Sequence, residues 1–214
     1  MPDKLRVLFL SANPERDTQP LRSETEARAI REELNRSRFQ IDLRTDYAMR
    51  IDDISRVLLD FEPSIIHFSG HGESNKLLFE DDRGRPAPVT ANGLAAVLTS
   101  VRALRVILLN ACESVTVADG LRDVAEYVIG IDGRISDHSA ILFATGFYRT
   151  LASGKSSREC FEGGVAELRL HGLRDAAMPR LMTRERRPMR NEVQDEPRKD
   201  GESKKVVIKH IYNL

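Results

Sequence analysis

Short runs of apolar residues alternate along this chain with longer stretches in which apolar residues recur every three or four positions. The short runs predict buried strands, and the longer stretches predict helices that pack one face against a sheet. We expect strands at 5–11, 39–43, 64–69, 104–109, 127–131 and 179–183. We expect helices at 21–35, 51–61, 94–98, 118–125, 140–151 and 159–170.

In three segments the pattern also predicts where the element lies in the fold. Residues 39–43 alternate apolar and polar side chains, which is typical of a half-buried edge strand. The helix at 21–35 carries one apolar stripe, and we interpret its many Glu and Arg side chains as a solvated face. A short hairpin is expected between 77 and 89, inserted after the third strand.

Strands that alternate with helices over short connections predict an α/β fold with a mostly parallel sheet and right-handed crossovers. A chain of 214 residues suits one such domain and is short for two. Apolar residues nearly vanish from 184–205, so we predict a disordered or loosely attached segment there, with 184–190 as a candidate site of self-cleavage. Residues 206–214 are apolar again and are expected to dock as a last strand or to form an interface with a partner.

The charge balance and the apolar runs narrow the class of protein. Lys and Arg number 33, as do Asp and Glu, and this neutral balance argues against bulk nucleic-acid binding. The first apolar run is too short for a signal-peptide core, and nothing approaches the roughly 20 apolar residues of a membrane span. We therefore expect a cytoplasmic protein whose two cysteines are free thiols.

Two of the expected buried strands end in residues that carry chemistry. The third runs into Gly70-His71-Gly72, where we expect a sharp turn, and the fourth runs into Asn110-Ala111-Cys112. Strands separated by one helical crossover are plausible neighbours, and the crevice beyond their carboxyl ends is where α/β sheets form sites. An imidazole and a thiol side by side suit nucleophilic attack on a carbonyl, with backbone amides of Gly72 and Cys112 placed for an oxyanion hole.

These motifs resemble the CHAT family of caspase-like cysteine peptidases. The resemblance rests on HFSGHG at 67–72 and LLNACES at 108–114, in that order. It is supported by LFLSANP near the start and by VIGIDGRISDHSAILFATGFYRTLASG at 128–154. The likeness covers roughly residues 5–183, and we assign 1–183 to the peptidase domain.

The resemblance implies a caspase-type three-layer α/β/α sandwich with strand order 2-1-3-4-5-6. It implies proteolysis without a metal or an organic cofactor, with His71 as the catalytic histidine, Cys112 as the nucleophile, and the amides of Gly72 and Cys112 in the oxyanion hole. Family members are often fused to or controlled by sensor modules in bacterial regulated proteolysis and defence. The implied partners are a protein substrate and a regulatory protein, without direct binding to nucleic acid or membrane.

Other residues near the motifs have simpler interpretations. We interpret His67 as a hydrogen-bonded core histidine and Cys160 as a packed thiol, in preference to a zinc site that would combine His67 with His71 and Cys112. The Gly70 loop lacks the GxxxxGK[ST] pattern of a phosphate-binding loop. Glu113 and Ser114 either shape the mouth of the site or cap the next helix, and both interpretations stay open.

Substrate preference depends on acidic residues after the fifth strand. Asp132 and Asp137 are candidates to line a pocket for Arg or Lys, and Asp137 is equally a candidate helix cap. Our first hypothesis is a cysteine endopeptidase that needs a partner to order its site. The alternatives are a non-catalytic caspase-like interaction module and a nucleotide-binding receptor built on the same sheet.

Overall fold

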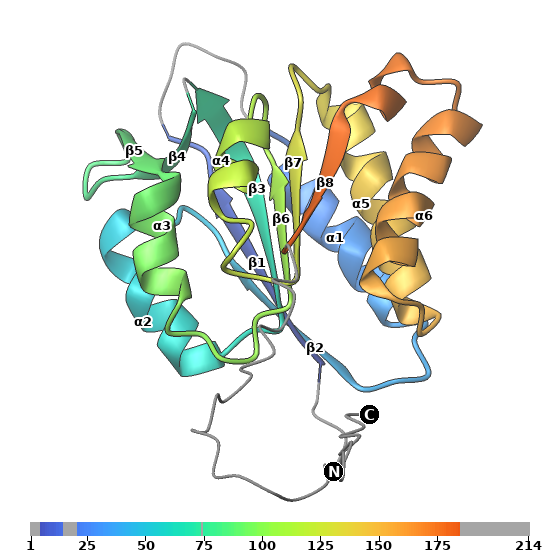
Figure 1. The fold of residues 1–214 in the computed structure, drawn as a ribbon, viewed down its shortest axis with the longest axis horizontal. Helices are drawn as coiled ribbons and strands as arrows, with labels where there is room; N and C mark the ends of the chain where they lie inside the picture. The colour runs from blue at the N-terminus through green and yellow to red at the C-terminus, as the bar shows by residue number, and fades with distance from the viewer. Residues whose placement is uncertain (1–4, 15–20, 74, 185–214) are drawn as a thin grey trace, which may run out of the picture.

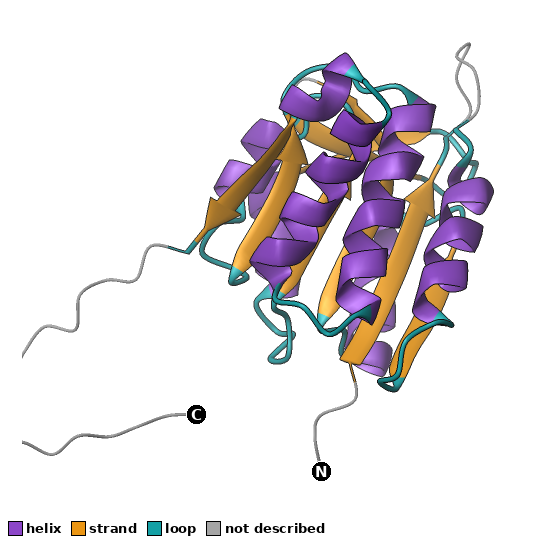
Figure 2. Ribbon diagram, turned by 90° about the vertical axis from the view of Figure 1, so that its right-hand side faces the viewer, coloured by secondary structure: helices purple, strands orange, loops and turns teal. Residues whose placement is uncertain are grey.

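A central sheet with helices on both faces organises the chain (Figures 1 and 2). The computed structural model describes residues 5–14, 21–73 and 75–184. The strands are β1 Leu5–Ala12, β2 Ile41–Asp46, β3 Ile65–Glu73, β4 Lys76–Glu80, β5 Pro86–Thr90, β6 Val106–Asn110, β7 Tyr127–Ile131 and β8 Pro179–Thr183. The helices are α1 Ser23–Leu34, α2 Ile51–Phe61, α3 Ala91–Leu98, α4 Val115–Gly120, α5 Asp137–Ala152 and α6 Ser157–Leu170, with a 3₁₀ turn at Arg174–Ala177.

The main path of the sheet runs in the order β2-β1-β3-β6-β7-β8. Its first five strands are parallel, and β8 pairs antiparallel with β7, with Ile131 opposite Pro179. Counting only these six strands, the order is the expected 2-1-3-4-5-6, which confirms the predicted mostly parallel α/β sandwich. The predicted hairpin is also confirmed, because β4 and β5 pair with each other and β4 extends from the end of β3.

Alternating side chains divide the core between the two faces of the sheet. On β1, Leu8 and Leu10 point into the cluster that packs under α2, α3 and α4, whereas Val7 and Phe9 belong to the cluster under α1, α5 and α6. All four side chains are at most 4% exposed. Strands buried on both faces read as continuous apolar runs, which is why β1 carries no polar alternation in the sequence.

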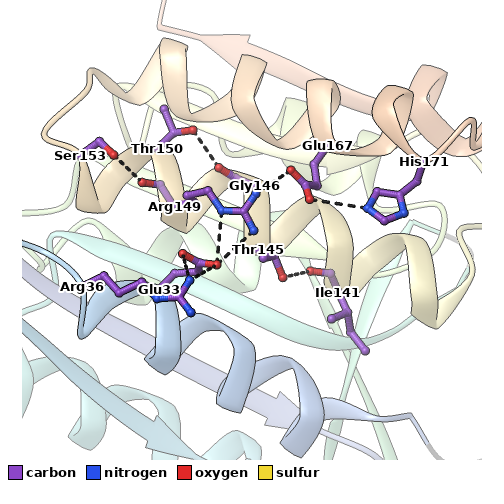
Figure 3. A network of polar contacts seen from close by, with 10 residues as sticks. All are labelled: Glu33, Arg36, Ile141, Thr145, Gly146, Arg149, Thr150, Ser153, Glu167 and His171. Atoms are coloured by element: carbon purple, nitrogen blue, oxygen red, sulfur yellow. Dashed lines mark hydrogen bonds and ion pairs between the residues drawn. The ribbon is translucent and has the colours of Figure 1, made fainter.

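One ion-pair network ties together the three helices of the second face (Figure 3). Arg149 of α5 donates from Nη2 to Glu33 Oε1 of α1 at 3.1 Å and from Nη1 to Glu167 Oε2 of α6 at 2.8 Å. Glu33 also accepts from Arg36 Nη1 at 3.2 Å. Because Glu33 is only 5% exposed, its carboxylate depends on these arginines for its hydrogen bonds.

The prediction that the charges of the first helix form a solvated face is wrong for two residues. Glu26 and Glu33 are 3% and 5% exposed, and both turn inward. Periodicity could not show this, since their partners come from β3, β6 and α5, far away in the sequence. Helix α4 begins at Val115, earlier than expected, because Ser114 bridges the ends of β6 and β7 directly before it.

None of the helices within the described ranges is long and apolar enough to cross a bilayer. The predicted charged segment, apart from Arg184, and the apolar segment at 206–214 lie outside the described residues.

Candidate active site

The segments that carry His71 and Cys112 lie against each other. Strands β3 and β6 are parallel neighbours, and Ser69 of β3 stands opposite Asn110, the last residue of β6. The backbones stay in close contact beyond this pair, because a Cβ placed on Gly72 would lie less than 3.0 Å from the carbonyl oxygen of Cys112. The same Cβ would be 3.6 Å from Cβ of Ala111. The structure therefore brings the two motifs together at one edge of the sheet.

The expected sharp turn at Gly70-His71-Gly72 is wrong. Strand β3 continues through Glu73, and His71 pairs with Leu78 of β4 in antiparallel register. Neither Gly70 nor Gly72 has a positive φ. These glycines serve close approach instead, since a Cβ on Gly70 would meet the ring of Phe68 and a Cβ on Gly72 would meet the backbone of Cys112.

Cys112 sits at a strained bend. Its Sγ lies 3.7 Å from the carbonyl oxygen of Ile135, within range of a weak S–H hydrogen bond, and the residue is partly buried. The next residue, Glu113, has φ of 55°, in the left-handed region that a non-glycine residue rarely adopts. Its amide donates to the carbonyl oxygen of Gly133 at 2.8 Å, which holds the bend in place. Strain of this kind collects at functional sites.

Asn13, which follows β1, contacts the imidazole of His71. Asn13 Oδ1 lies 3.2 Å from His71 Nε2. Register explains the contact, because Ala12 stands opposite Gly70 in the β1–β3 pair. In the sequence, Asn13 stood out only as part of the LFLSANP segment that supports the family resemblance. The one signal that could have found it is its place in the chain. Asn13 is a polar residue directly after β1, the strand that neighbours the histidine strand β3.

A buried polar cluster underlies the site on the face covered by α1 and α5. Glu26 Oε1 lies 3.0 Å from His67 Nε2 and accepts from Asn110 Nδ2 at 2.5 Å, while Glu26 Oε2 accepts from Ser69 Oγ at 2.6 Å. His67 Nδ1 is 3.2 Å from the hydroxyl of Tyr148. This arrangement agrees with the interpretation of His67 as a hydrogen-bonded core histidine.

Opposing effects act on the ionisation of Glu26. Burial by itself raises the pKa of this carboxyl, but the charge and hydrogen bond of His67, with the hydrogen bonds of Ser69 and Asn110, hold the pKa below its usual 4.5. Burial also raises the pKa of the Tyr148 hydroxyl well above its ordinary value. The cluster therefore holds an ionised carboxylate next to a protonated phenol, directly beneath the strand end that carries Cys112.

A cavity of about 30 Å³ opens beside Cys112, between the starts of α1 and α5 and the ends of β3 and β6. Its lining residues are Leu21, Arg22, Ser23, Glu26, Ser69, Gly70, Asn110, Ala111, Cys112, Ile135, Asp137, Ala140 and Ile141. This volume holds about one water molecule. Among the described residues, Asn110 Oδ1 finds no hydrogen-bond donor although it is buried.

The acidic residues singled out from the sequence occupy different places. Asp137 lines the cavity and accepts from the backbone N–H of Arg22 at 3.3 Å, while Ser136 caps α5. Asp132 is not among the lining residues and forms an ion pair with Arg180 Nη2 at 2.9 Å. Glu113 is exposed and does not line the cavity.

Ser114 and Cys160, which the sequence also singled out, have structural roles. Ser114 donates to the carbonyl oxygen of Leu109 and accepts from the amide of Ile131, so it links strand ends and does not cap α4 with its side chain. Cys160 is fully buried, and burial raises the pKa of its thiol to about 12. This agrees with the interpretation of Cys160 as a packed thiol that does not ionise near neutral pH.

One family model and two curated proteins match this chain in sequence. The family model described as "CHAT domain" matches residues 2–169. A protein named "Probable protease" from Gillisia limnaea is 24% identical over 167 residues, which is 74% of this chain and 29% of that protein. A "Roc-COR-CHAT protease" from an unknown prokaryotic organism is 26% identical over 129 residues, 53% of this chain and 12% of that protein. The chain thus matches less than a third of the length of either relative.

Solved structures share the fold at low sequence identity. A secreted C11 cysteine protease from Bacteroides thetaiotaomicron, in complex with an irreversible peptide inhibitor, superposes with a TM-score of 0.52. The match has 14% identity and covers 76% of this chain and 58% of that one. The Arg-specific cysteine proteinase gingipain R gives a TM-score of 0.58 at 11% identity, over 84% of this chain and 46% of that one. The fold is that of caspase-like cysteine proteases.

Proposed function

The chain belongs to the CHAT domain family, and on that premise we propose that it is a cysteine endopeptidase with Cys112 as nucleophile and His71 as proton carrier. The observation that carries the proposal is the contact between Gly72 and the backbone of Cys112, which leaves no room for a Cβ. The end of β3 and the segment after β6 are pressed together this closely, and they carry an imidazole and a thiol at one edge of the sheet. That pair is what nucleophilic catalysis on a peptide carbonyl requires.

In the proposed reaction, the Cys112 thiolate attacks the peptide carbonyl carbon and the carbonyl oxygen becomes an oxyanion. The amides of Gly72 and Cys112 are proposed to donate to that oxyanion. His71 gives its proton to the leaving amine as the C–N bond breaks. It then takes a proton from water, whose oxygen attacks the acyl-enzyme and releases Cys112.

Labelling of Cys112 tests this dyad. A peptidyl acyloxymethyl ketone is expected to label Cys112 of the wild type and to spare Cys160, whose thiol is buried. In His71→Ala the labelling rate at about pH 7 is expected to fall about 30-fold, because an unassisted cysteine is only a few per cent ionised at that pH. Peptide mapping by mass spectrometry gives the rate and the labelled position.

His138→Ala is the matched control, because His138 is an exposed histidine on α5 and its loss should leave labelling unchanged. Undiminished labelling of Cys112 in His71→Ala would contradict the dyad. It would favour a caspase-like interaction module without catalysis.

We further propose that the cavity beside Cys112 receives the side chain that precedes the cut, and that this side chain is Arg or Lys. The carboxylates of Glu26 and Asp137 line the cavity against one cation, the exposed Arg22. Asn110 adds a buried acceptor without a donor among the described residues. Since the cavity holds about one water molecule in this state, it must widen to admit a substrate side chain.

Asp137→Asn is expected to reduce the preference for arginine over citrulline at that position about fivefold, because a partly exposed carboxylate contributes roughly 1 kcal/mol to a cationic ligand. Initial rates on a matched pair of peptide aminocoumarin amides measure the preference. Asp132→Asn is the control, because Asp132 pairs with Arg180 outside the cavity and its loss should leave the ratio unchanged. An unchanged ratio in Asp137→Asn would remove Asp137 from the pocket.

We propose that another protein or domain regulates this peptidase in bacterial regulated proteolysis or defence signalling. Support comes from the length of the curated relatives, in which the matching region is 29% or 12% of the protein. The name Roc-COR-CHAT itself joins this domain to others in one chain. Substrate proteins and the regulator would then contact the loops at the carboxyl edge of the sheet, where the proposed dyad lies.

A further inference from the structure

Asn13 reaches the imidazole of His71 from a different strand of the sheet. It follows β1, which is the parallel neighbour of β3, and its Oδ1 lies 3.2 Å from His71 Nε2. The contact therefore crosses 58 residues of sequence and joins the strand ends that carry the motifs LFLSANP and HFSGHG.

Two further contacts determine which way the Asn13 amide points. The backbone N–H of Leu21 donates to Asn13 Oδ1 at 3.4 Å, and a backbone N–H can only donate. The backbone N–H of Asn13 itself donates to Glu80 Oε1 of β4 at 3.0 Å. Glu80 thus holds the Asn13 backbone from the hairpin that extends the histidine strand, while Leu21 assigns the amide oxygen to the side that faces His71.

The contact with Asn13 Oδ1 shows which nitrogen of the His71 imidazole carries the proton. Since Asn13 Oδ1 cannot donate, Nε2 must carry a hydrogen in this contact. The neutral ring then has its basic lone pair on Nδ1. When Nδ1 takes a proton, the ring becomes an imidazolium, and the hydrogen bond from Nε2 to Asn13 strengthens because its donor is now charged.

We propose that Asn13 is the positioning residue of the dyad: it holds the His71 ring in the Nε2–H tautomer and stabilises the imidazolium that accompanies the Cys112 thiolate. This inference rests on the proposed function and adds a third residue to it. Asn13 acts through His71 and does not touch the reacting atoms. Glu80 acts one step further away, by keeping the Asn13 backbone in place.

Alkylation of Cys112 by iodoacetamide at two pH values tests the inference without a substrate. At about pH 9.5 most cysteine thiols are ionised unaided, whereas at about pH 6 an accessible thiol reacts quickly only if an imidazolium stabilises its thiolate. The ratio of the rate at pH 6 to the rate at pH 9.5 therefore reports stabilisation of the thiolate. Altered access to the thiol would change both rates alike and leave the ratio as it was.

In Asn13→Ala the ratio is expected to fall about tenfold, with the rate at the higher pH within about twofold of wild type. Asn13→Asp keeps an oxygen acceptor of the same shape and is expected to restore the ratio to within about threefold of wild type. Asn92→Ala, at an exposed position on α3, should behave as wild type.

Two results would overturn the inference. One is an unchanged ratio in Asn13→Ala, whether the two rates stay as they were or fall by the same factor, and the other is a failure of Asn13→Asp to restore the ratio. His71→Ala separates the two proposals. If His71→Ala lowers the ratio while Asn13→Ala does not, the dyad stands without Asn13; if His71→Ala also leaves the ratio at the wild-type value, both proposals fail.

Discussion

Gly72→Ala is expected to lower kcat/KM about 1000-fold on the peptide aminocoumarin amide that the wild type cleaves best. The new Cβ would lie less than 3.0 Å from the carbonyl oxygen of Cys112, and neither group is a flexible side chain that can move aside. The strand ends must part to relieve this overlap. A displacement of about 1 Å costs roughly 100-fold in rate, and loss of an oxyanion donor costs about 100- to 1000-fold. The two effects overlap, so we expect a combined loss of about 1000-fold and not their product.

Gly93→Ala provides the matched control for this substitution. Gly93 lies in α3, and a Cβ there would be 3.5 Å from its nearest neighbour, an ordinary contact. This variant should keep full activity and gain about 0.5–1 kcal/mol of stability, since alanine is the better helix former. Gly72→Ala should lose about 1–3 kcal/mol, as overpacked sites do. Activity within tenfold of wild type in Gly72→Ala would show that Gly72 and the backbone of Cys112 are not pressed together in solution.

Glu26→Ala is expected to lower the free energy of unfolding by about 3–5 kcal/mol. The substitution removes the partner of three buried polar groups, the His67 imidazole, the Ser69 hydroxyl and the Asn110 amide. Each of these groups is buried and loses its hydrogen bond or ion pair with the carboxylate. Urea unfolding followed by circular dichroism measures the change.

Glu32→Ala lies on the same helix at an exposed position and should change the unfolding free energy by less than about 0.5 kcal/mol. If Glu26→Ala were as mild as this control, the buried cluster would contribute little to stability. The folded protein would then tolerate three unsatisfied groups beneath Cys112.

The ionisation of Glu26 should also make the stability of the protein depend on pH. Interactions in the folded state hold the pKa of Glu26 below 4.5, so its contribution to stability is complete above about pH 4.5 and is lost as the pH falls through the lower folded value. The stability difference between wild type and Glu26→Gln is therefore expected to shrink as the pH is lowered from about 5 to 3. Unfolding free energies measured across that range test the sign, and a difference that grows towards acid would contradict it.

The proximity of the two motifs was accessible from the sequence because it depends on strand order. Two apolar runs separated by one helical crossover become neighbours in a parallel sheet, and their carboxyl ends then meet. That reasoning predicted the β3–β6 pair and the edge at which the motifs lie. It failed at Gly70 and Gly72, because a glycine that permits a turn and one that permits close backbone contact look alike in a sequence.

Only the tertiary structure distinguishes the roles of Asp132 and Asp137. Asp132 and Asp137 stand five positions apart after β7, yet one pairs with Arg180 of β8 and the other faces the cavity. The sequence could not separate them, since the partner of Asp132 arrives 48 residues later in the chain.

The sequence by itself determined most of the strands and helices and the two motifs, because apolar periodicity and strand-end chemistry are local signals. The full sheet order came from the family resemblance. Only the tertiary structure decided that Glu26 turns inward to His67 and that Asn13 meets His71. Contacts of this second kind join residues from separate strands and helices, and local patterns carry no trace of them. They exist because the folded sheet brings the ends of β1, β3 and β6 to one edge, where a buried polar atom must find its partner in another element or lose the free energy of its hydrogen bond.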